Sequence, residues 1–178
     1  MSLLRFLGLG SKEEGRAPET GETETVRRIA ARLERLDPAT ARYLASFAYV
    51  LGRVAHADLA IDADETREME RRVAALASLS PEETALVVEI AKAQQRMLGG
   101  TENYVVTRAF RDASTPEQRR ELVSCLFAVA AADGSISATE SAEINAIADE
   151  LGLARSEVVA LRAGYRDKLG VLQGMPRG

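Results

Sequence analysis

The sequence predicts an all-α fold, and three observations support this prediction. Apolar residues return at helical spacing along most of the chain, as Val26, Ile29 and Leu33 illustrate. Ala, Leu, Glu and Arg, which favour helix intrinsically, are frequent in these segments. No segment alternates between apolar and polar residues with the period of two that is typical of a strand. For a chain of 178 residues we expect a single compact domain of about seven to eight helices.

Composition excludes several classes of protein. The formal charge is −4, which argues against a protein that coats nucleic acid, because such proteins need a basic face. Aromatic residues make up only 4%, too few for a base-stacking platform. The chain has one cysteine and one histidine, so it can form neither an internal disulfide nor a zinc site based on several cysteines. Its longest apolar runs span about half of what a bilayer requires, so we expect no transmembrane segment.

The first 22 residues are predicted to form a flexible N-terminal segment ahead of a helical domain over 23–178. Five large apolar residues make a short plug, and the stretch from Ser11 to Thr25 is polar and contains several glycines and glutamates. The plug is too short for a stable isolated helix and lacks the cleavage site of a secretory leader. It could dock on its own domain, on a partner or on a membrane surface. We expect a cytoplasmic protein. The plug residues are Leu3, Leu4, Phe6, Leu7 and Leu9.

In the first half of the domain, capping signals separate the predicted helices. The first helix carries the apolar positions from Val26 to Leu36, and Asp37-Pro38 ends it and begins the next, which runs to about Ala57. A charged helix follows over about 63–77. Its arginines alternate with glutamates, which predicts a solvated face of ion pairs. Ser80-Pro81-Glu82-Glu83 then combines an N-cap, a first-turn proline and a capping-box acid.

The second half follows the same rules. The helix that begins at Pro81 is predicted to reach Gly99-Gly100, and Thr101 caps a shorter helix that contains Phe110. Thr115-Pro116 with Gln118 begins the next helix. Two further helices are predicted over about 138–151 and 155–172.

One segment of the chain repeats. Residues 51–65 and 126–140 share apolar and acidic positions, and the register continues to Leu76 and Leu151. Each copy is predicted to be a helix, a short loop and a second helix, so the body of the fold would be two related hairpins packed face to face. In this register Asp58 matches Asp133 and Glu65 matches Glu140.

The paired acidic residues have two interpretations. Asp62 and Ser137 precede Glu65 and Glu140 by three residues, so both glutamates could complete capping boxes. Alternatively, carboxylates and loop carbonyls could bind a hard cation such as Ca²⁺, Mg²⁺ or Mn²⁺, which prefers oxygen ligands. An EF-hand is excluded, because Met69 and Ile144 occupy the position of its terminal glutamate. The candidate metal ligands are Asp58, Asp62, Glu65, Asp133 and Glu140.

The two motifs carry a family resemblance. His56-Ala-Asp58-x-x-Ile61-x-x-x-Glu65 and Ala131-Ala-Asp133-Gly134-x-Ile136-x-x-x-Glu140 resemble the paired signature of the TerB family, known from tellurite resistance. The resemblance covers roughly residues 44–169. It implies a helical fold, divalent cation binding at the two acidic loops, a role in stress response and partners at the inner membrane. Leu59 departs from the glycine expected after the first aspartate, where the second copy has Gly134.

No set of residues indicates catalysis. His56 is the chain's only histidine, and its counterpart in the second copy is Ala131, so we interpret it as a structural or surface residue. Cys125 falls on the apolar stripe of its helix, which predicts a buried, inert thiol. We therefore expect a non-enzymatic TerB-like module that binds a divalent cation and engages partner proteins. The alternative is a metal-independent interaction scaffold whose acidic residues are helix caps. A metal-dependent hydrolase is disfavoured.

Overall fold

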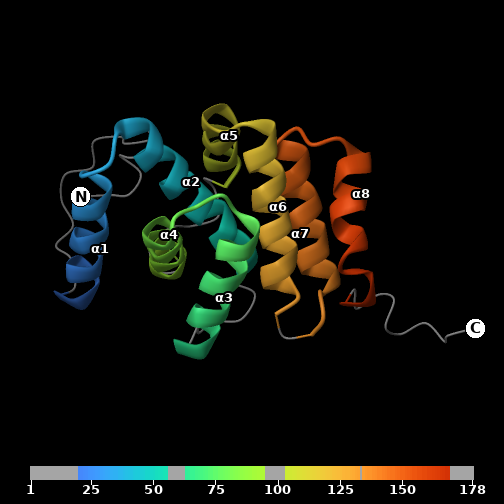
Figure 1. Ribbon diagram of the computed structural model, residues 1–178, viewed down its shortest axis with the longest axis horizontal. Coiled ribbons are helices and arrows are strands. Elements are labelled where there is room, and N and C mark those ends of the chain that lie inside the picture. Colours follow the sequence, from blue (N-terminus) through green and yellow to red (C-terminus); the bar gives the residue numbers. More distant parts are fainter. Residues whose placement is uncertain (1–19, 56–62, 95–102, 133, 169–178) are drawn as a thin grey trace, which may run out of the picture.

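The computed structural model describes residues 20–55, 63–94, 103–132 and 134–168, and Figure 1 shows their arrangement. The described residues form α-helices and one short 3-10 helix over Arg166–Lys168, which confirms the all-α prediction. The α-helices are α1 (Thr20–Leu33), α2 (Pro38–Ala55), α3 (Ala63–Leu76), α4 (Pro81–Gln94), α5 (Asn103–Ala113), α6 (Pro116–Ala130), α7 (Ala138–Glu150) and α8 (Arg155–Ala163).

The predicted capping signals are confirmed where helices α2 and α4 begin. At α2, Oδ1 of Asp37 accepts the backbone N–H groups of Ala39 and Thr40 at 3.1 and 3.0 Å. At α4, Ser80 and Glu83 form a reciprocal pair, in which each side chain accepts the other residue's backbone N–H. These side chains satisfy donors that the first turn of a helix leaves without a partner inside the helix, so they define where each helix starts.

Two helix ends differ from the prediction. Helix α1 begins at Thr20, inside the stretch expected to be a linker. Helix α8 ends at Ala163 rather than near residue 172, because Gly164 follows and the chain tightens into a turn in which the N–H of Tyr165 donates to the carbonyl of Arg162. This turn returns Tyr165 to the body of the protein, where its ring stacks on that of Phe127 with centroids 5.8 Å apart.

Helix α2 lies at the centre of the fold and packs against α4, α5, α6 and α7. It is apolar on nearly all sides, as expected of a helix that other helices surround. Its Tyr43 and Phe47 form an aromatic cluster with Phe110 of α5, with ring centroids 5.4–6.0 Å apart. The buried residues of α2 are Ala41, Tyr43, Leu44, Ala45, Ser46, Phe47, Ala48, Tyr49, Val50, Leu51, Gly52 and Val54.

Helix α6 organises the second half of the domain and packs against α2, α3, α7 and α8. Helices α1 and α8 lie at opposite ends of the long axis (Figure 1). Helix α3 packs on α6, and α7 packs on α2, so the second helix of each predicted hairpin contacts the first helix of the other. The internal repeat itself stays a prediction.

None of the helices in the described ranges combines the length and the apolar character needed to cross a bilayer.

Candidate functional site

The predicted metal ligands are described only in part. Asp58, Asp62 and Asp133 lie outside the described residues, as does His56. Glu65 belongs to the first turn of α3, but its side chain is not among those described. Glu140 is the one candidate ligand whose side chain is described. The two interpretations of the acidic motif can therefore be compared at the connection between α6 and α7.

A tight loop joins α6 to α7. The N–H of Gly134 donates to the carbonyl of Ala131, and Gly134 adopts a φ of +97°. This conformation favours glycine, because a side chain there would be strained. Two residues later, Ile136 is only 1% exposed and anchors the loop in the hydrophobic core.

Glu140 completes the capping box that its spacing predicts. Its Oε2 accepts the backbone N–H of Ser137 at 2.8 Å, and Oγ of Ser137 accepts the N–H of Glu140 at 3.1 Å. Oε1 of Glu140 has no hydrogen-bond or ion-pair partner among the described residues. The side chain is thus fixed at the start of α7, with one carboxylate oxygen engaged by the cap.

Elsewhere, the described part of the chain contains no group of three or more His, Cys, Asp or Glu residues that could hold a metal ion. Asp133 is the predicted ligand closest in sequence to Glu140.

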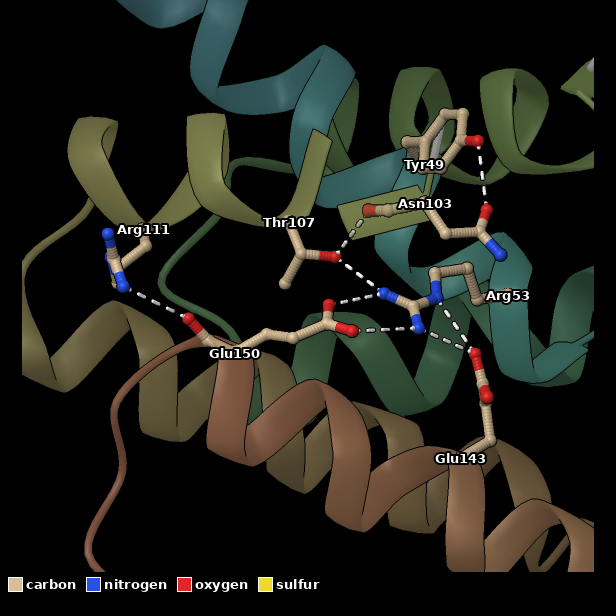
Figure 2. A network of polar contacts seen from close by, with 7 residues as sticks. All are labelled: Tyr49, Arg53, Asn103, Thr107, Arg111, Glu143 and Glu150. Atoms are coloured by element: carbon tan, nitrogen blue, oxygen red, sulfur yellow. Dashed lines mark hydrogen bonds and ion pairs between the residues drawn. The ribbon is translucent and has the colours of Figure 1, made fainter. Parts of the chain in front are cut away.

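A densely connected polar cluster of described residues lies between α2, α5 and α7, as Figure 2 shows. Arg53 of α2 donates from Nε to Oε1 of Glu143 at 2.8 Å, and from Nη1 to Oε2 of Glu150 at 2.7 Å. Nη1 also donates to Oγ1 of Thr107 at 2.6 Å. The side chain of Arg53 is only 6% exposed. Burial alone would lower its pKa, but the two glutamates outweigh that effect and raise it, so Arg53 stays charged.

The Arg53 cluster extends through α5. The hydroxyl of Thr107 donates to the carbonyl of Asn103 at 2.9 Å, and the hydroxyl of Tyr49 donates to Oδ1 of Asn103 at 3.0 Å (Figure 2). The arrangement fixes three helices relative to one another, and we interpret it as structural. No pattern considered in the sequence predicted this cluster. The sequence did contain one signal for it, because Arg53 directly follows the long apolar run of α2. A charged side chain in such apolar surroundings needs a partner.

The remaining candidates behave largely as predicted. Cys125 is fully buried, and burial raises the pKa of its thiol to about 12, so it is an inert core residue. On α3, Arg67 pairs with Asp64 and Arg71 with Glu68 on exposed faces. Arg72 departs from the predicted solvated face, because its Nη1 donates to the carbonyl of Ala128 in α6 at 2.8 Å.

One of the comparisons with known proteins finds a match, and it is to a family. No curated protein and no solved structure matches the chain at a significant level. The family described as "Tellurite resistance protein TerB" matches residues 43–163, which is more than half of the chain and includes both acidic motifs. On this evidence the chain belongs to the TerB family.

Proposed function

We propose that this chain is a non-enzymatic TerB module that binds a divalent cation at the loop between α6 and α7 and engages partner proteins in a stress response. Family membership supports the general part of the proposal. The observation that supports the proposed cation site is the position of the Glu140 side chain. The capping box holds this side chain beside the loop that contains Asp133. Its Oε1 has no partner among the described residues.

The capping box is compatible with cation binding. The cap uses only Oε2 of Glu140, so Oε1 stays available to a cation. A single carboxylate oxygen can act as a ligand of Ca²⁺, Mg²⁺ or Mn²⁺. Because the cap already restricts the side chain, little further conformational entropy would be lost on binding. Asp133 would supply the second carboxylate, and Asp58, Asp62 and Glu65 would form the corresponding site of the first loop. Partners at the inner membrane belong to the same proposal.

The second candidate is a metal-independent interaction scaffold, and the same capping box favours it. A glutamate at the third position of a helix is explained by the N–H that it accepts and by the positive end of the helix dipole. In this interpretation Glu140 and its counterpart Glu65 stabilise helix starts and bind nothing.

Thermal unfolding of metal-stripped protein separates the two candidates, because a ligand of the folded state raises the midpoint by mass action. The decisive variant is Glu140→Gln, since glutamine can fill the same place in a capping box but carries no charge. The matched control is Ser137→Ala, which removes the cap and keeps the carboxylate.

The cation proposal predicts that millimolar Ca²⁺, Mg²⁺ or Mn²⁺ raises the midpoint of the wild type and of Ser137→Ala, and that Glu140→Gln loses the rise. In the absence of cation, Ser137→Ala should cost about 1 kcal/mol of stability and Glu140→Gln much less. If no cation shifts the wild type, or if Glu140→Gln responds as the wild type does, the cation site is wrong and the scaffold remains.

A further inference from the structure

We draw no further inference here: the strongest candidate, the surface patch of exposed Tyr104, Val105 and Arg108 on α5, is a helix face for which nothing in the described part of the structure shows what covers it.

Discussion

Two contacts join the halves of this chain at equivalent positions of the predicted repeat, and they are built differently. Between α2 and α7, Glu143 binds Arg53 of the facing helix, and this arginine is almost fully buried. Between α3 and α6, Glu68 occupies the position of Glu143, but it binds Arg72 of its own helix at 2.6 Å. Arg72 then reaches the carbonyl of Ala128, which takes the position of Arg53.

The difference shows that a repeated acidic position does not determine its partner. Both halves place a glutamate at the same point of their second helix, yet the cation comes from another helix in one case and from the same helix in the other. The buried version depends on Thr107 and Glu150, which satisfy donors of Arg53 that Glu143 leaves free. The buried charge of Arg53 is therefore stabilised by several hydrogen-bonding partners together, not by one ion pair.

The largest expected effect on stability comes from replacing Arg53, and it is measured against the same replacement of Arg72. Arg53→Met should lower the free energy of unfolding by roughly 3 kcal/mol, because it leaves two glutamates and a threonine hydroxyl without their shared donor. Arg72→Met should lower the free energy of unfolding by only about 1 kcal/mol, because the side chain of Arg72 is 27% exposed and Glu68 remains paired with Arg71. Both variants keep an apolar stem of similar length. Urea unfolding measures the difference, and equal costs would remove the distinction between the two contacts.

The next effect concerns the second loop, which joins α6 to α7. Gly134→Ala should destabilise the protein by about 1–2 kcal/mol, because an added side chain is strained at a φ of +97° although the space around it is open. Gly164→Ala is the control, since Gly164 has an ordinary helical φ of −65° and should tolerate alanine without loss. Thermal unfolding of both variants checks this. If Gly134→Ala is as stable as Gly164→Ala, the second loop does not depend on its glycine.

The smallest effect is on pH dependence. Burial opposes the charge on Glu68, but Arg72 and Arg71 outweigh it and hold its pKa below the usual value of 4.5. A carboxyl group whose pKa is lowered by folding stabilises the protein above the unfolded pKa, and this contribution is lost as the pH falls through the folded pKa. Stability should therefore fall below about pH 4.5, and Glu68→Gln should flatten part of that fall. An identical pH profile for wild type and variant would contradict this assignment.

Local signals in the sequence predicted much of the fold. The starts of α2, α4, α6 and α7 follow from Asp37, Ser80, Thr115 and Ser137, because a cap and the N–H groups that it accepts lie within one turn. Helix α8 ends earlier in the sequence than predicted, although Gly164, a residue type that commonly follows the end of a helix, marks its end.

The polar interior was not predictable in the same way. Arg53 and Glu150 are far apart in the chain, and only the packing of α2 on α7 brings them within 2.7 Å. For the candidate metal site, the sequence predicted the capping box of Glu140, while the cation itself stays a proposal.

Binding of a divalent cation at the second loop, between α6 and α7, can be measured directly as bound metal. Metal-stripped wild type and Glu140→Gln are dialysed to equilibrium against Mn²⁺, and the free ion is quantified by electron paramagnetic resonance. We expect saturable binding by the wild type and at least about tenfold weaker binding by Glu140→Gln, because a charged oxygen ligand is lost. Equal binding by the two proteins, or no saturable binding by either, would contradict it.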